Sequence, residues 1–135
     1  MENYENIGLK KGEKVLKQII PNPAEFFLHY IFGGALCFLY GIGIIYILLI
    51  EVDRRKTKYY ITTERVIYEH TFLGNNVSSV NYSKIQDLHL KQNFLEKSFE
   101  IGNIEINTAG SNKKELKLKG IKKPVKIKNI IENQY

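Results

Sequence analysis

Chemically reactive side chains are scarce in this sequence. It contains a single cysteine, three histidines and two aspartates among 135 residues. One cysteine excludes an internal disulfide framework and a zinc site built from cysteines. The histidines are scattered, and Asp87 has no evident base or nucleophile as a partner, so neither a metal site nor an acid–base pair is predicted. We therefore expect a protein that is not an enzyme and that has no cofactor, catalytic residue or bound metal.

Positive charge is in excess. Twenty lysines and arginines against fourteen aspartates and glutamates give a formal net charge of +6 at pH 7. An excess of this sign favours acidic partners, namely anionic lipid, nucleic acid or acidic protein. The length fits one domain, or one small domain with an appendage.

The residue types divide the chain into three segments. Residues 1–23 form a polar N-terminal segment of mixed charge, and its two terminal prolines, Pro21 and Pro23, favour an extended turn. Residues 24–52 are predicted to be a transmembrane segment. Residues 57–135 are predicted to be a β-rich domain, because polar and apolar side chains alternate through most of them.

The transmembrane prediction depends on the uncharged run at residues 26–50. These twenty-five positions contain no Asp, Glu, Lys or Arg. As one helix they would be ~37 Å long, whereas the hydrocarbon core of a bilayer is ~30 Å thick. In a hairpin each arm would be only ~18 Å long, too short to cross. A buried core helix would need a shell of partners that the remaining residues are too few to supply, so we expect one N-terminal transmembrane α-helix.

The flanking residues favour retention of this segment and indicate its direction. The run begins too late for a cleaved signal peptide, and charged residues at 51–56 follow it in place of a cleavage site. Residues 11–25 contain three lysines, and residues 51–65 contain five Lys or Arg. This bias predicts a location in the cell membrane with the β-rich domain in the cytoplasm. The side on which residues 1–23 lie, and a re-entrant hairpin in place of a span, are left open.

The β-rich domain has two kinds of pattern. Period-two alternation between Lys58 and Lys119 predicts six or seven antiparallel strands. Beyond it, Pro124 suits the first position of a helix, and three isoleucines from Ile127 to Ile131 follow at i, i+3, i+4 spacing. We expect a C-terminal helix whose apolar stripe covers an open end of the sheet.

Five short motifs follow one another along the chain. They lie at residues 12–16 (GEKVL), 60–67 (YITTERVI), 82–88 (YSKIQDL), 92–102 (QNFLEKSFEIG) and 107–110 (NTAG). In this combination the chain resembles the bacterial and archaeal pleckstrin-homology-like (PH-like) domains that flank membrane segments, often called YdbS-like domains. The resemblance implies a mainly-β PH-like domain, closed by a C-terminal helix and placed beside a membrane.

The chain departs from this family in two ways. Family members commonly carry two spans before the domain, where this chain has room for one. Glu100 stands where the family pattern has a glycine. In addition, the turn at residues 62–64 has no lysine, so we do not predict the inositol phosphate pocket of eukaryotic PH domains. Thr62 and Arg65 are expected to stabilise that turn by local hydrogen bonds.

The basic residues next to the apolar run and near the C-terminus are candidate contacts for anionic lipid headgroups. Each can contribute ~1 kcal/mol beside an anionic leaflet, and the attraction is screened beyond ~10 Å. The alternative is a solvated edge, on which lysine prevents strand pairing. Nucleic acid is not expected as a partner, because the lysines lack interleaved aromatic residues. The candidates are Arg54, Arg55, Lys56, Lys113, Lys114, Lys117, Lys119, Lys122, Lys123, Lys126 and Lys128.

A stripe of small residues is a candidate for helix self-association. Gly33, Cys37 and Gly41 fall at i, i+4 and i+8, a spacing that lets two helices approach closely. The alternative is that glycine is simply frequent in membrane spans.

Together these features predict a membrane-anchored PH-like protein that acts as a non-enzymatic interaction or assembly module at the cytoplasmic membrane surface. Its expected partners are anionic lipid headgroups, bound without specificity, and a second copy or another membrane protein. The alternative is a subunit of an envelope-stress or antimicrobial-resistance membrane complex whose activity lies in a partner.

Overall fold

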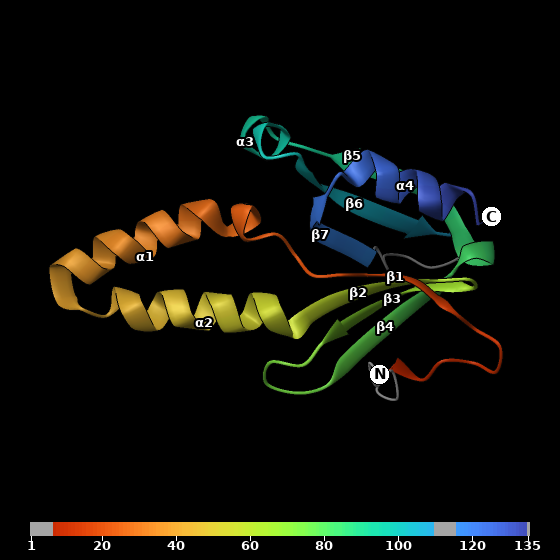
Figure 1. Ribbon diagram of the computed structural model, residues 1–135, viewed down its shortest axis with the longest axis horizontal. Coiled ribbons are helices and arrows are strands. Elements are labelled where there is room, and N and C mark those ends of the chain that lie inside the picture. Colours follow the sequence, from red (N-terminus) through yellow and green to blue (C-terminus); the bar gives the residue numbers. More distant parts are fainter. Residues whose placement is uncertain (1–6, 110–115, 135) are drawn as a thin grey trace.

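The computed structural model describes residues 7–109 and 116–134, except for the side chains of Leu39 and Tyr40. Within them the chain forms two antiparallel sheets, a pair of long helices that extends to one side, and a C-terminal helix (Figure 1). The first sheet has the order β1-β2-β3-β4 and consists of β1 (Val15–Ile19), β2 (Thr57–Thr62), β3 (Arg65–His70) and β4 (Asn76–Asn81). The second has the order β5-β6-β7 and consists of β5 (Ile85–Lys91), β6 (Ile101–Thr108) and β7 (Leu116–Lys122).

The core lies between the two sheets and under the C-terminal helix α4 (Pro124–Glu132). Alternate side chains of each strand point inward, as the period-two pattern requires. Ile61, Ile104 and Leu118 are completely buried, and Ile127 and Ile131 of α4 pack against them. Burying one such side chain contributes roughly 1.5–3 kcal/mol. The predicted mainly-β architecture and the predicted C-terminal helix are both present.

The chain from Ile7 onward packs on the outer face of the first sheet. Ile7 packs there against Tyr60 and Ile67 in a second, smaller cluster of buried side chains. The carboxylate of Glu13, which has no exposed surface, pairs with Arg65 at 3.0 Å. Thr62 Oγ1 accepts a hydrogen bond from the backbone N–H of Arg65 at 3.0 Å, so the expected local hydrogen bonds in this turn are present.

The predicted N-terminal transmembrane helix is wrong. The apolar run forms two helices, α1 (Phe27–Tyr40) and α2 (Gly43–Lys56), each of 14 residues. Gly41, at φ 71°, ends α1 in the left-handed conformation that glycine adopts without strain. Charged residues at 51–56 occupy the last turns of α2. In the part of the chain that the structure describes, no helix is long and apolar enough to cross a membrane.

The helices are inserted between two neighbouring strands of one sheet. β1 precedes them, pairs antiparallel with β2, and places Lys17 opposite Ile61. A short 3₁₀ turn, η2 (Pro23–Phe26), leads from β1 into α1. The predicted N-terminal segment, residues 1–23, therefore contributes β1 to the same sheet as β2, β3 and β4. The expected boundaries at residues 23, 52 and 57 stay predictions.

Candidate interaction site at the helical hairpin

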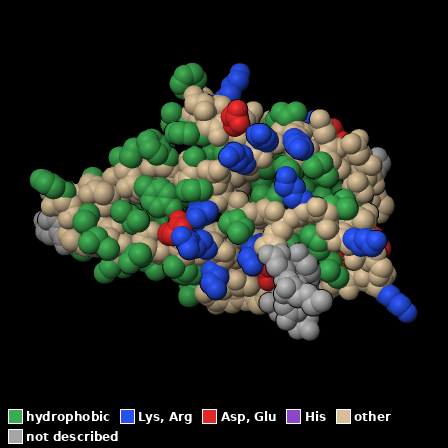
Figure 2. Space-filling model, in the orientation of Figure 1, with side chains coloured by type: hydrophobic (Ala, Val, Ile, Leu, Met, Phe, Trp, Pro, Cys, Tyr) green, Lys and Arg blue, Asp and Glu red, His purple; other side chains and the backbone are tan. Residues whose placement is uncertain are grey.

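The hairpin of α1 and α2 carries a large exposed apolar surface. The two helices lie side by side and extend away from the sheets (Figure 1). Many hydrophobic side chains are exposed on the face of the hairpin that Figure 2 shows. Single exposed hydrophobic residues are ordinary, but a continuous apolar patch marks a contact site. The exposed large hydrophobic residues of the hairpin are Phe27, Leu28, Ile31, Phe32, Phe38, Ile42, Ile44, Ile45, Leu48, Leu49 and Val52.

Small residues hold the two helices together. A β-carbon on Gly43 would overlap the backbone of Gly33 and Cys37, and one on Gly33 would lie 2.6 Å from Ile47 Cγ1. Two of the three residues predicted to mediate self-association, Gly33 and Cys37, thus pack α1 against α2 of the same chain. The third, Gly41, forms the turn. Self-association with a second chain stays a prediction.

Glu51 fixes the base of the hairpin. Its carboxylate lies 2.7 Å from Arg54 Nη2 and 2.6 Å from Arg55 Nε, and it accepts a hydrogen bond from the Tyr30 hydroxyl at 2.8 Å. Hydrogen bonds from Arg54 and then Arg55 outweigh burial and hold the pKa of Glu51 well below its usual range. Arg54 also donates to the carbonyl oxygen of Pro21 at 2.8 Å. The last turns of α2 are therefore bonded both to α1 and to the segment that precedes α1.

Further contacts join the hairpin to both sheets. Asp53 of α2 lies 2.7 Å from the ring of His70 at the end of β3. The backbone N–H of Asn22 donates to the carbonyl oxygen of Gly120 in β7 at 2.9 Å. With both sheets engaged, the base of the hairpin has a defined position on the domain.

A cleft of about 480 Å³ opens beside this base. Asp53 and His70 line it on one side, and Lys117 and Lys119 of β7 on the other. Tyr59 lies at its floor, where burial raises the pKa of its hydroxyl to about 12. This cleft combines aromatic walls with two cationic side chains, directly beneath the apolar hairpin.

The predicted lipid-contact residues lie in different places. At the hairpin base, Arg54 is largely buried by its contacts with Glu51 and Pro21, whereas Arg55 and Lys56 are exposed. Lys117 and Lys119 line the cleft. Around α4, Lys122, Lys123 and Lys126 are exposed, and Lys128 pairs with Glu132 at 3.0 Å. Lys113 and Lys114 lie outside the described residues. The structure thus brings five of the predicted cations to the hairpin base and its cleft, and leaves four near α4.

The contacts of three site residues, Glu51, Asp53 and Tyr30, were missed from the sequence. Glu51 stands at i, i+3 and i, i+4 from Arg54 and Arg55, a spacing that signals ion pairs on one helix face. The contact of Asp53 with His70 crosses between elements and has no local signal. No cluster of His, Cys, Asp and Glu suited to a metal ion occurs within residues 7–109 and 116–134.

Comparison with known proteins identifies one family. A family model described as "Bacterial PH domain" matches residues 15–135, from β1 to the C-terminus. No curated protein matches the chain. Among solved structures, the chain is similar to the crystal structure of a DUF1696 family protein with a pleckstrin-homology domain from Shewanella loihica PV-4. The identity is 18%, the TM-score is 0.45, and the alignment covers 57% of this chain and 68% of that chain.

Proposed function

This chain belongs to the bacterial PH domain family, and from that premise we propose that it is a non-enzymatic interaction module working at the cytoplasmic surface of the cell membrane. The α1–α2 hairpin is the element that contacts lipid. The observation that carries this proposal is the number of large hydrophobic side chains that are exposed along both helices of the hairpin.

Lipid is the partner that fits the distribution of these side chains. Exposed hydrophobic residues occur on both helices, from Leu28 near the base to Phe38, 93% exposed, near the tip. A protein partner commonly covers one face of an element, whereas acyl chains surround it. Each Å² of apolar surface removed from water contributes roughly 25 cal/mol. Covering the hairpin with lipid is therefore strongly favourable.

The charges at the base suit the headgroup layer. Arg55 and Lys56 project from the last turn of α2, and Lys117 and Lys119 line the cleft beside it. With the hairpin in lipid, these groups lie at the level where anionic headgroups begin. Each can then contribute about 1 kcal/mol at low ionic strength, so anionic lipid should strengthen an association that the hairpin provides.

Vesicle flotation of the full chain tests this proposal. The vesicles are phosphatidylcholine alone or mixed with phosphatidylglycerol. A tip variant combines Phe38→Asp with Ile42→Asp. Its control combines Leu16→Asp with Val125→Asp, two exposed apolar positions outside the hairpin that are 46% and 56% exposed. We expect the wild type and the control to float with the vesicles and the tip variant to remain at the bottom of the density gradient.

The charge variant and the oligomeric state complete the test. Arg55→Glu with Lys56→Glu should lower binding only to vesicles that contain phosphatidylglycerol. If the wild type does not float, or the tip variant floats as well as the control, the hairpin does not contact lipid. A stable dimer that the tip variant abolishes, without any flotation, would identify a second copy of this chain as the hairpin's partner.

A further inference from the structure

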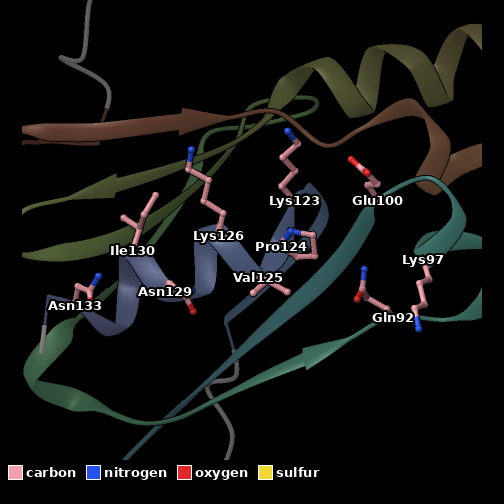
Figure 3. Close-up of a pocket in the computed structure, with 10 residues that line it drawn as sticks. All are labelled: Gln92, Lys97, Glu100, Lys123, Pro124, Val125, Lys126, Asn129, Ile130 and Asn133. Carbon is pink, nitrogen blue, oxygen red and sulfur yellow. The ribbon is translucent and has the colours of Figure 1, made fainter.

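A second concave surface, lined by no residue of the hairpin, lies between α3 (Phe94–Ser98) and the exposed side of α4 (Figure 3). Its volume is about 630 Å³. We call it the α3–α4 groove. The residues that line it are Gln92, Lys97, Glu100, Lys123, Pro124, Val125, Lys126, Asn129, Ile130 and Asn133.

The floor of the groove is tightly packed. Gln92 Nε2 donates to the carbonyl oxygen of Ile101 at 2.6 Å. A β-carbon on Gly102 would lie 2.6 Å from Gln92 Cγ and 3.0 Å from Pro124 Cγ, so these two side chains rest directly on the glycine backbone. A floor held in this way does not need to rearrange when a ligand enters, as is usual for binding sites.

Two residues at the rim have an unusual backbone conformation. Glu100 and Lys123 have φ of 55° and 51°. This is the left-handed conformation, which residues other than glycine rarely adopt. The backbone N–H of Lys123 donates to the carbonyl oxygen of Glu100 at 2.8 Å. This bond fixes the start of α4 against the end of α3 and sets the width of the groove at that point.

The charge of the groove is predominantly positive. Lys97, Lys123 and Lys126 are exposed, and none of them forms an ion pair with a carboxylate of the described residues. In Figure 3 the side chains of Lys123 and Lys126 extend from α4 toward the same side. Elsewhere, Lys91 and Lys128 are paired with Glu105 and Glu132. The groove therefore keeps cations available for an external acid, with Glu100 as its one acidic residue.

Apolar side chains line the same groove. Val125 is 56% exposed, and Pro124 and Ile130 line the groove beside it. A ligand whose carboxylates meet the lysines can also place an apolar side chain against Val125. We propose that the α3–α4 groove docks an acidic peptide segment of a partner protein through an apolar side chain flanked by carboxylates. The concave shape of the groove favours such a segment over a flat bilayer surface.

Binding of a defined peptide to the full chain tests the proposal. The probe is a short fluorescent peptide in which glutamates flank a Leu-Phe pair, measured by anisotropy in a non-ionic detergent that covers the hairpin. Its matched control has lysines in place of the glutamates. We expect the acidic peptide to bind and the basic one not to bind, and NMR shifts of the amides of Val125 and Asn129 should move on binding.

Two charge-reversed variants locate the binding. Lys123→Glu with Lys126→Glu should lower the affinity for the acidic peptide about tenfold, because each reversal removes an exposed ion pair and adds a repulsion of similar size. Lys14→Glu with Lys17→Glu makes the same charge change on exposed residues in and beside β1 and should change the affinity less than about twofold. Val125→Asp should abolish binding while leaving vesicle flotation unchanged.

Three outcomes would overturn the proposal. The first is no binding of the acidic peptide to the wild type. The second is equal weakening by both double variants, which would show attraction to net charge alone. The third is a response of Val125 and Asn129 to phosphatidylglycerol vesicles and not to the peptide, which would assign the groove to lipid. Dispersed amide spectra of each variant verify that it is folded.

Discussion

Gly43 of α2 contacts Gly33 of α1 backbone to backbone, so that a β-carbon on Gly43 would overlap the Gly33 carbonyl oxygen. This approach makes the apolar run a hairpin instead of a continuous helix. It also uses, within one chain, small residues of the kind that join separate membrane helices.

Gly43→Ala should therefore separate the two helices. The added methyl group has no space, and overpacking of this kind destabilises by about 1–3 kcal/mol. Gly34→Ala is the matched control, because a β-carbon there meets nothing within 4 Å and alanine favours a helix by about 1 kcal/mol. Denaturant unfolding followed by circular dichroism should show a lower free energy of unfolding for Gly43→Ala and no decrease for Gly34→Ala. Equal stability of the two variants would contradict the close packing.

Replacement of Glu13 by glutamine should destabilise the domain at neutral pH. Burial alone would raise the pKa of Glu13, but hydrogen bonds from Arg65, the Lys10 backbone and Thr62 outweigh it and lower the pKa below 4.5. A lowered pKa contributes stability that is present above pH 4.5 and is lost as the pH falls through the folded value. Glutamine keeps an acceptor oxygen but removes the negative charge that pairs with Arg65, and a hydrogen bond to a charged group contributes about 1.5–3 kcal/mol.

The measurement is thermal unfolding from neutral to acid pH. The melting temperature of the wild type should fall on acidification. The melting temperature of Glu13→Gln should be lower at neutral pH and should fall less. Lys10→Met serves as the control, because Lys10 and Glu64 form an exposed pair at 3.0 Å that contributes at most about 1 kcal/mol. A Glu13→Gln protein as stable as Lys10→Met at neutral pH would show that the buried pair is not needed.

Glu25 should make the opposite contribution. Burial first, and the negative charge of Glu96 second, raise its pKa above 4.5, and its Oε2 is buried without a hydrogen-bond partner among the described residues. A raised pKa gives stability that is complete below pH 4.5 and is lost as the pH rises through the folded value. Glu25→Gln keeps the shape of the side chain and removes the charge, so it should stabilise the protein above that pH.

Melting temperatures of the wild type and Glu25→Gln should coincide in acid and diverge as the pH rises, with the variant higher. Parallel curves for the wild type and Glu25→Gln would contradict a raised pKa at this position.

Tyr59→Phe should weaken the contact between the two sheets. The Tyr59 hydroxyl of β2 accepts a hydrogen bond from the backbone N–H of Lys119 in β7 at 3.0 Å. Removing it leaves that N–H without its partner, at a cost of about 1–3 kcal/mol. Tyrosinate absorbance should also lose one group that ionises near pH 12. Tyr68→Phe, at a half-buried tyrosine stacked on Tyr59, should change stability less. The opposite order of the two variants would contradict this role.

The resemblance to PH-like domains identified the family correctly at the level of bacterial PH domains, while the membrane-flanked, YdbS-like subgroup stays a prediction. Of the candidate site, the sequence could supply the cations but not their neighbours. Arg54 looked like a free lipid contact, yet it is occupied by Glu51 and Pro21. Lys123 and Lys126 were placed with the membrane contacts, and only the packing of α4 beside α3 shows that they share a groove.

By itself the sequence determined the features that repeat locally. Side chains follow the fixed period of a strand or helix, so a repeating pattern shows which side of an element is buried. This holds for the alternation along β6 and β7 and for the stripe of Ile127, Ile130 and Ile131. Only the tertiary structure decided that β1 joins β2 across the inserted helices and that the apolar run turns back at Gly41. Both depend on contacts between residues distant in the chain, such as Gly33 with Gly43 and Lys17 with Ile61, and local periodicity contains no information about which distant partner a residue will meet.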